Sequence, residues 1–196
     1  TFESNLELVL DKLVLSKADV QSLGIRNGDF VSLHPRFRIS TDGYLKSRFL
    51  DDKIGVALLL AFTKYIKEEN VKLNRKTYVS FSVYEEVLHG GGPKVPEDVT
   101  ELLGIDMGCV GEHLDGSETK VSIVARDNYG PYNYEVITAL VELCIKSNID
   151  YAVDCYSGYI SDVVTALIAG HDVKHGLIGP GVYASHSYER TNLRAV

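Results

Sequence analysis

Residues 49–69 read FLDDKIGVALLLAFTKYIKEE and residues 77–84 read TYVSFSVY, and these two stretches decide the fold class. In the first, apolar side chains recur at the three- and four-residue spacing of a helix over 54–69, which Asp52 is placed to cap. In the second, Val and Phe alternate with Tyr and Ser, which predicts a strand over 77–84. A helix followed by a strand is the building unit of an α/β fold.

The rest of the chain extends this pattern. We expect further strands at 102–105, 121–125, 151–156 and 175–178, and helices at 132–147 and 161–169. Residues 1–48 differ, because their apolar runs at 6–9, 13–15 and 31–33 are short and suggest β segments. The sequence therefore predicts a three-layer α/β/α domain with a mostly parallel central sheet over 49–196, preceded by a partial β segment over 1–48.

The composition excludes several classes of function. The 196 residues suffice for one sizeable core, and the net charge of −7 without a Lys/Arg cluster argues against a nucleic-acid partner. No apolar run approaches the ~20 residues that span a bilayer, so we expect no membrane partner. The three cysteines are odd in number and widely spaced, and no signal peptide is recognisable, which together favour a reducing compartment, the cytoplasm.

Acidic and imidazole side chains follow the predicted strands, where α/β sheets form their sites. The candidates are Asp51, Glu85, Glu86, Asp106 and His186. A helix cap explains one aspartate of the Asp51–Asp52 pair, which leaves the other free to bind cations. A turn residue is the simpler reading of Asp106, and a loop imidazole such as His186 is a ligand that zinc accepts.

The adjacent Glu85 and Glu86 give the clearest chemical signal. On an extended backbone they point to opposite sides, and two carboxylates lose hydration and repel each other unless a positive charge is near. One carboxylate that binds a metal ion while the other faces an attacking water satisfies both constraints. A solvated strand end is the alternative.

Together, the stretches 50–55, 81–87, 105–108 and 185–191 resemble the M42 family of metallo-aminopeptidases, of the glutamyl or tetrahedral aminopeptidase type. The resemblance runs from about residue 23 to residue 192 and keeps the order and rough spacing of the motifs. It implies a zinc-peptidase-like fold and an enzyme that removes N-terminal residues from peptides with two divalent cations. Zinc suits these ligands best, cobalt and manganese also suit them, and the full-length parent is expected to be a homo-oligomer.

The resemblance also implies a role for each candidate residue. Asp51 corresponds to the carboxylate that bridges both cations, and Asp106 to a ligand of one of them. Glu86 and His186 correspond to ligands of the other, and Glu85 to the general base. The family further implies a cis peptide bond after Asp51.

The sequence departs from the family in two places. The family's first metal ligand is a histidine near the N-terminus, ahead of an inserted β domain, and nothing in residues 1–48 matches it. Those residues instead resemble the tail of the inserted domain, so we expect a fragment that lacks the N-terminal segment and has a truncated catalytic domain. Leu88 also stands where the family commonly has glycine.

Two other functions stay open. A truncated or degenerate domain could bind metal or peptide without turnover, and the absent histidine favours this for the chain by itself. An endoglucanase-like glycoside hydrolase would need two converging carboxylates about 5–9.5 Å apart, whereas Glu85 and Glu86 are expected to diverge.

Overall fold

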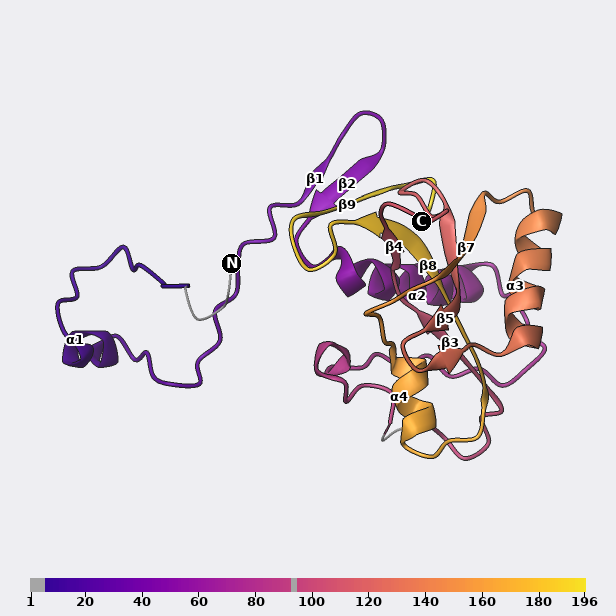
Figure 1. Cartoon of the computed structure of the whole chain (residues 1–196), viewed down its shortest axis with the longest axis horizontal. Helices are drawn as coiled ribbons and strands as arrows, with labels where there is room; N and C mark the ends of the chain where they lie inside the picture. The colour runs from indigo at the N-terminus through magenta and orange to yellow at the C-terminus, as the bar shows by residue number, and fades with distance from the viewer. Residues whose placement is uncertain (1–5, 93–94) are drawn as a thin grey trace. The chain divides into compact units, whose positions relative to one another are not determined.

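The computed structural model describes residues 6–92 and 95–196 (Figure 1). The chain divides into two units, residues 1–34 and 35–196. In the part that the structure describes, no helix is long and apolar enough to cross a membrane.

Over residues 6–34, the smaller unit contains one short helix and none of the expected β segments. Helix α1 (Lys17–Ser22) starts at Ser16, whose hydroxyl accepts a hydrogen bond from the Asp19 backbone N–H. The runs at 6–9, 13–15 and 31–33 form no strand, and Leu13 is 90% exposed. The β interpretation of these runs is wrong because a strand needs a hydrogen-bonded neighbour, which an apolar run alone does not provide.

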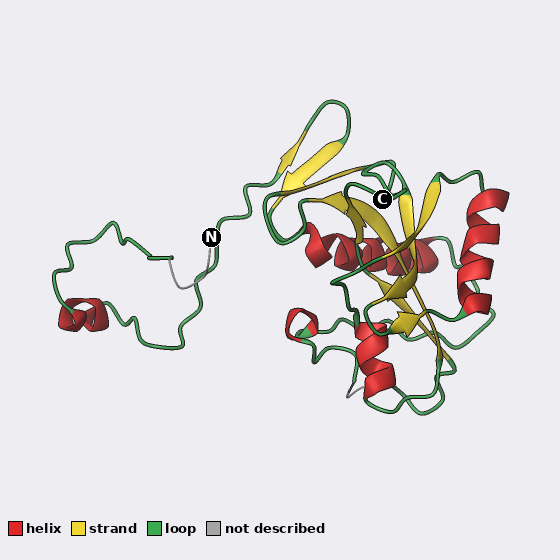
Figure 2. Ribbon diagram, in the orientation of Figure 1, coloured by secondary structure: helices red, strands yellow, loops and turns green. Residues whose placement is uncertain are grey.

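The larger unit contains the sheet and its helices (Figure 2). In chain order its elements are β1 (Arg38–Ile39), β2 (Tyr44–Ser47), α2 (Leu50–Glu68), the 3₁₀ turn η2 (Glu85–Val87), β3 (Glu101–Ile105), β4 (Gly108–Val110), β5 (Val121–Asp127), β6 (Gly130–Pro131), α3 (Tyr134–Lys146), β7 (Tyr151–Cys155), α4 (Asp162–Ile168), β8 (Lys174–Tyr183) and β9 (Glu189–Asn192). The helices expected at 54–69, 132–147 and 161–169 are therefore present, as are the strands at 102–105, 121–125, 151–156 and 175–178. Strands β1 and β2 lie before residue 48, and β2 pairs with β9 of the same unit. The predicted domain boundary at residue 48 stays a prediction.

The sheet is mixed rather than mostly parallel, so that part of the prediction is wrong. The long strand β8 pairs in parallel with β3 and β4 but antiparallel with β5 and β9. Strand β5 adds a parallel partner, β7, and an antiparallel one, β6. The α/β class is confirmed, but short connections such as those of β1–β2 and β5–β6 fold the chain back on itself and produce antiparallel pairs.

Helices α3 and α4 cover opposite faces of the sheet. Strands β3 and β8 are paired with Leu103 opposite Gly176 and Gly104 opposite Leu177, so neighbouring positions face opposite sides. A Cβ added at Gly176 would overlap Val136 of α3, whereas a Cβ at Gly104 would lie 3.2 Å from Val163 of α4. The sheet is thus enclosed between these helices at β3 and β8.

The strand expected over 77–84 is also absent. None of these residues is assigned to a strand, and Val83 is 85% exposed. The alternation of side chains is present, but the backbone has no ladder partner among the described residues.

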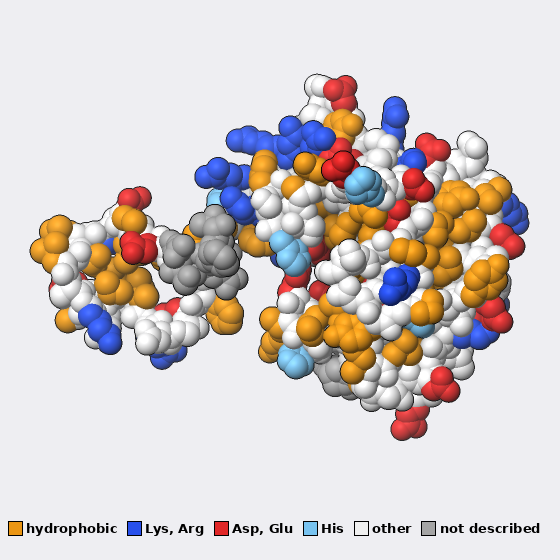
Figure 3. All heavy atoms as spheres, viewed as in Figure 1, with side chains coloured by type: hydrophobic (Ala, Val, Ile, Leu, Met, Phe, Trp, Pro, Cys, Tyr) orange, Lys and Arg blue, Asp and Glu red, His pale blue; other side chains and the backbone are white. Residues whose placement is uncertain are grey.

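Many apolar side chains are exposed on the visible face of the larger unit, drawn orange in Figure 3.

A small apolar cluster holds the start of α2 against the sheet. Leu50 and Ile54 are buried together with Leu45 of β2, Met107 and Val182 of β8. Complete burial of such side chains contributes roughly 1.5–3 kcal/mol each. The cluster fixes the backbone on both sides of Asp51, the first candidate ligand.

Candidate metal centre

The start of α2 separates two adjacent aspartates into different roles. Asp51 and Asp52 have non-helical backbone angles, and the peptide bond between them is cis, as expected. The Gly55 backbone N–H donates a 3.1 Å hydrogen bond to Oδ1 of Asp52, so Asp52 caps the regular helix as predicted. Asp51 is not needed for the cap, and its carboxylate faces the loop after β8.

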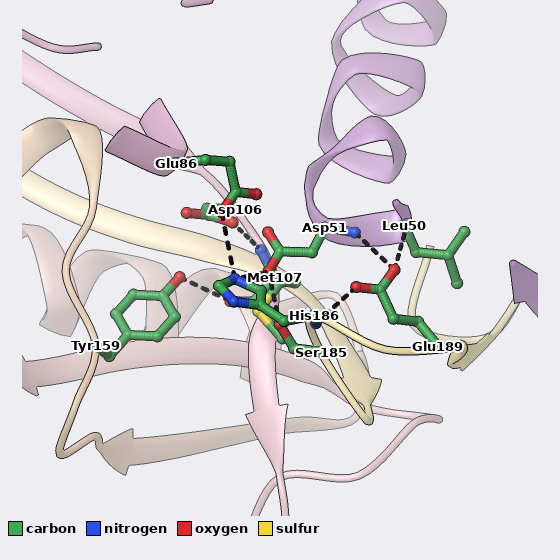
Figure 4. Close-up of polar contacts among 9 residues, drawn as sticks. All are labelled: Leu50, Asp51, Glu86, Asp106, Met107, Tyr159, Ser185, His186 and Glu189. Atoms are coloured by element: carbon green, nitrogen blue, oxygen red, sulfur yellow. Dashed lines mark hydrogen bonds and ion pairs between the residues drawn. The ribbon is translucent and has the colours of Figure 1, made fainter. Parts of the chain in front are cut away.

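Three of the predicted ligands meet at one point. His186 Nε2 lies 3.2 Å from Oδ2 of Asp51 and 3.3 Å from Oε2 of Glu86 (Figure 4). One ligand atom from each of the three residues lies within 4.8 Å of the others. Ligands about 2.0–2.1 Å from a tetrahedral zinc ion are roughly 3.3–3.4 Å apart, so two carboxylates and an imidazole at these distances fit a divalent cation.

Glu85 and Glu86 lie in different surroundings, as expected. The expected cause, an extended strand on which neighbouring side chains point to opposite sides, is absent. They lie in η2, a 3₁₀ turn, rather than at the end of a strand. Burial and the Asp51 carboxylate raise the pKa of Glu86, while His186 and Lys53 lower it. Burial, followed by the Asp106 and Asp162 carboxylates, raises the pKa of Glu85 to about 8. Glu86 thus faces the His186 cluster, and Glu85 faces other acids.

Asp106 directly follows β3. Its carboxylate interacts electrostatically with that of Asp51, but it is not one of the three converging ligands Asp51, Glu86 and His186. Its Oδ1 accepts a 2.7 Å hydrogen bond from the Met107 backbone N–H. The Tyr159 hydroxyl donates a 2.8 Å hydrogen bond to the Met107 carbonyl, which fixes this turn (Figure 4). Burial and the Asp51 carboxylate raise the pKa of Asp106 to about 7.

The raised pKa values of the acids at this site are the pattern expected where a cation binds. Burial, followed by Asp106, raises the pKa of the capping Asp52 to about 9, so its carboxyl joins Glu85 and Asp106 among acids that resist ionisation. Carboxylates that raise one another's pKa mark functional sites, and a divalent ion would reverse the penalty by favouring the ionised forms. The donor set and the charge pattern therefore both fit a metal centre.

Two residues beside the cluster received no role in the sequence interpretation. The Ser185 hydroxyl donates a 2.6 Å hydrogen bond to Oδ2 of Asp51. Glu189 of β9 is 1% exposed and accepts hydrogen bonds from the backbone N–H groups of Leu50, Asp51 and His186. The only sequence signal for Glu189 was its position, three residues after His186 within the motif that carries this histidine.

Three residues around the cluster have left-handed backbone conformations: Phe49 (φ 63), Ala184 (φ 59) and His186 (φ 63). Such conformations cost non-glycine residues on the order of 1–3 kcal/mol each and persist where surrounding contacts enforce them. They lie in the two segments that supply Asp51 and His186. The backbone of the site is therefore held in place by its surroundings.

The loop that carries Glu85 and Glu86 is anchored on α4. The Gly91 backbone N–H donates a 3.1 Å hydrogen bond to Oγ1 of Thr165. A Cβ added at Gly91 would overlap the backbone oxygen of Asp162, so only glycine fits this approach. Leu88 has φ 64, which explains why glycine suits this position in the resembling family.

Comparison with known proteins gives concordant matches. A family model described as M42 glutamyl aminopeptidase matches residues 2–196. The curated protein YhfE of Bacillus subtilis (strain 168) is 44% identical over 190 residues, which cover 97% of this chain and 55% of that protein. The chain thus spans about half the length of this relative.

Solved structures share the fold at lower identity. Aminopeptidase APDkam598 from the archaeon Desulfurococcus kamchatkensis matches with a TM-score of 0.78 and 23% identity, over 92% of this chain and 53% of that one. The TET1 peptidase of Pyrococcus horikoshii, which can assemble into a tetrahedron or a large octahedral shell, matches with a TM-score of 0.72 and 20% identity, over 92% and 54%.

Proposed function

Because this chain belongs to the M42 glutamyl aminopeptidase family, we propose that it carries most of the active site of an enzyme that releases N-terminal residues from peptides. The observation that carries the proposal is the convergence of Asp51, Glu86 and His186 from three separate segments onto one point. The charge pattern around them supports it, since several partly buried carboxylates without a cation repel one another.

We assign the ligands of two divalent cations to four residues. Asp51, Glu86 and His186 would hold one cation, and Asp51 and Asp106 would contribute to the second, with Asp51 shared. Bound there, divalent cations supply Lewis-acid polarisation of a scissile carbonyl and activation of water. Zinc is the first choice, because it accepts imidazole and carboxylate ligands at the observed spacing, and cobalt or manganese could replace it.

Glu85 is proposed as the general base. Its carboxylate would take a proton from the attacking water and pass it to the nitrogen of the leaving amine. Burial and the Asp106 and Asp162 carboxylates raise the pKa of Glu85 in the metal-free protein, and bound cations would lower it again toward the ionised form that a base needs. Glu86 is committed to His186 and Asp51, which leaves Glu85 for proton transfer.

The relatives and the cysteines support proposals for assembly and location. The Pyrococcus horikoshii relative forms large shells, so we propose a homo-oligomer for the full-length protein. Cys109, Cys144 and Cys155 are free thiols, consistent with a reducing compartment, for which the cytoplasm is the simplest choice. Light scattering on the purified full-length protein tests the first proposal, and a monomer would contradict it.

The function is tested with the full-length protein, loaded with Zn²⁺, on a short peptide and on the same peptide with an acetylated N-terminus. We expect release of the first residue from the free peptide and none from the acetylated one, because an exopeptidase of this type must recognise the free amine. Cleavage of both at an internal bond, or of neither, would contradict the proposal.

A further inference from the structure

Glu189 connects two distant segments of the site through its carboxylate (Figure 4). Its Oε2 accepts hydrogen bonds from the backbone N–H groups of Leu50 and Asp51, the latter at 3.1 Å. Its Oε1 accepts a 3.1 Å hydrogen bond from the backbone N–H of His186. One side chain thus holds the backbone of Asp51 and the backbone of His186, which lie 135 positions apart in the sequence.

The chemistry of this contact requires a carboxylate. All three partners are N–H donors, and an ionised carboxylate offers only acceptors, on two oxygens. A glutamine of the same shape would turn an NH₂ group toward at least one of these donors. Because Glu189 is 1% exposed, water does not replace a lost partner, so a buried N–H would stay unsatisfied.

The two segments need this support because of their backbone conformation. Phe49, just before Leu50, and His186 itself are in the left-handed region, with φ 63 in both cases. Bulky side chains rarely adopt it, and the conformation persists only where contacts enforce it. Both left-handed residues lie at or beside a backbone group that Glu189 binds.

We propose that Glu189 is a positioning residue that sets the cation affinity of the site by fixing Asp51 and His186 at the spacing a cation requires. This rests on the proposed metal centre. Glu189 lies outside the group of ligand atoms formed by Asp51, Glu86 and His186, and its carboxylate contacts backbone N–H groups instead. Loss of a residue that orients metal ligands typically weakens metal affinity or activity about 10–100-fold.

The test compares Glu189→Gln with Glu118→Gln in the full-length protein. Glu118 is a matched control, because its carboxylate accepts hydrogen bonds from Nε and Nη2 of Arg190, the next residue on β9, and has no contact with the cluster. Competition of Zn²⁺ between each protein and a chelator gives the affinity. The visible absorption of bound Co²⁺ reports the geometry of its ligands.

For Glu189→Gln we expect about 10–100-fold weaker Zn²⁺ binding and a changed Co²⁺ spectrum. Glu118→Gln should lower the unfolding temperature while keeping both metal readouts at the wild-type values. Should Glu189→Gln fail to fold, Glu189→Asp keeps the charge but is one methylene too short to reach both segments, and the same losses are expected.

The outcomes separate the two proposals. If the folded Glu189 variant binds Zn²⁺ as tightly as the wild type with an unchanged Co²⁺ spectrum, the role of Glu189 is overturned and the metal centre stands. If the wild type binds no divalent cation, the proposed metal centre itself fails. Equal losses of affinity in the Glu118 and Glu189 variants would show a general effect of destabilising β9, which also overturns the specific role.

Discussion

The Ser185 hydroxyl donates a 2.6 Å hydrogen bond to Oδ2 of Asp51. The same oxygen lies 3.2 Å from His186 Nε2, so the loop after β8 both supplies one candidate ligand and orients another. Two segments far apart in the sequence therefore form one unit, held by a side-chain contact here and by backbone contacts at Glu189.

Replacing Ser185 by alanine should weaken divalent-cation binding about 10–100-fold, because it removes a hydrogen bond that orients a metal ligand. The direction follows from the lost orientation of the Asp51 carboxylate. Calorimetric titration of the metal-free protein with Zn²⁺ measures it. Ser187→Ala, in the same loop, is the control and should bind as the wild type does; an unchanged affinity in Ser185→Ala contradicts the prediction.

Replacing Glu85 by glutamine should lower kcat roughly 10²–10⁴-fold, the usual contribution of a general base, while the metal content stays at the wild-type value. Glu86→Gln provides the contrast, because it removes a ligand and should lower the metal content. Steady-state kinetics and elemental analysis on the same samples measure both. A Glu85 variant that keeps its turnover would rule out this base.

Removal of divalent cations by a chelator should abolish peptide hydrolysis, and Zn²⁺, Co²⁺ or Mn²⁺ should restore it. It should also destabilise the fold, because a ligand present at 100 times its Kd stabilises the folded state by about 2.7 kcal/mol. Activity assays and thermal unfolding after chelation measure the two effects. Hydrolysis of a glucan that survives the chelator would instead support the glycoside hydrolase alternative.

The stability of the metal-free protein should fall as the pH rises from about 4, near the ordinary pKa of a carboxyl group, to about 9. Folding raises the pKa of Asp106 to about 7, of Glu85 to about 8 and of Asp52 to about 9. These acids hold their protons more tightly when folded, so their stabilisation is complete below their ordinary pKa values, falls as the pH rises above them, and is lost once the pH passes the raised values. His175, whose pKa burial lowers from 6.5, has the opposite effect only at lower pH.

Thermal unfolding in the presence of a chelator, recorded across this pH range, measures that slope. Saturating Zn²⁺ should flatten it, since the cation favours the ionised carboxylates. A metal-free protein whose unfolding temperature rises with pH would contradict the pKa shifts.

Local patterns predicted what depends on local contacts. The helix over 54–69 and its Asp52 cap follow from side-chain spacing and a hydrogen bond three residues away, and both are present. The strand over 77–84 is not, because a strand depends on a neighbour that no local pattern specifies. The predicted parallel direction of strand pairing was wrong for the same reason. Strand β5 pairs with β8 in antiparallel orientation, and the two strands lie far apart in the sequence.

The candidate site divides in a similar way. Asp51, Glu86 and His186 were predicted because their motifs carry the residue types that bind metals, and the structure brings them together. Glu189 was not predicted, because its carboxylate binds backbone N–H groups. Every residue except proline has such a group, so the sequence does not indicate which of them a side chain will bind.

Gly91→Ala should reduce activity and stability together, because the added Cβ would overlap the backbone oxygen of Asp162 and push the loop that carries Glu85 and Glu86 away from α4. Overpacking of this kind costs typically 1–3 kcal/mol, or roughly 2–12 °C in unfolding temperature for a chain of this size. A displacement of about 1 Å can also cost on the order of 100-fold in turnover. Gly111→Ala is the control, because a Cβ there meets nothing within 4 Å. If the two variants behave alike, the contact with α4 does not position the loop.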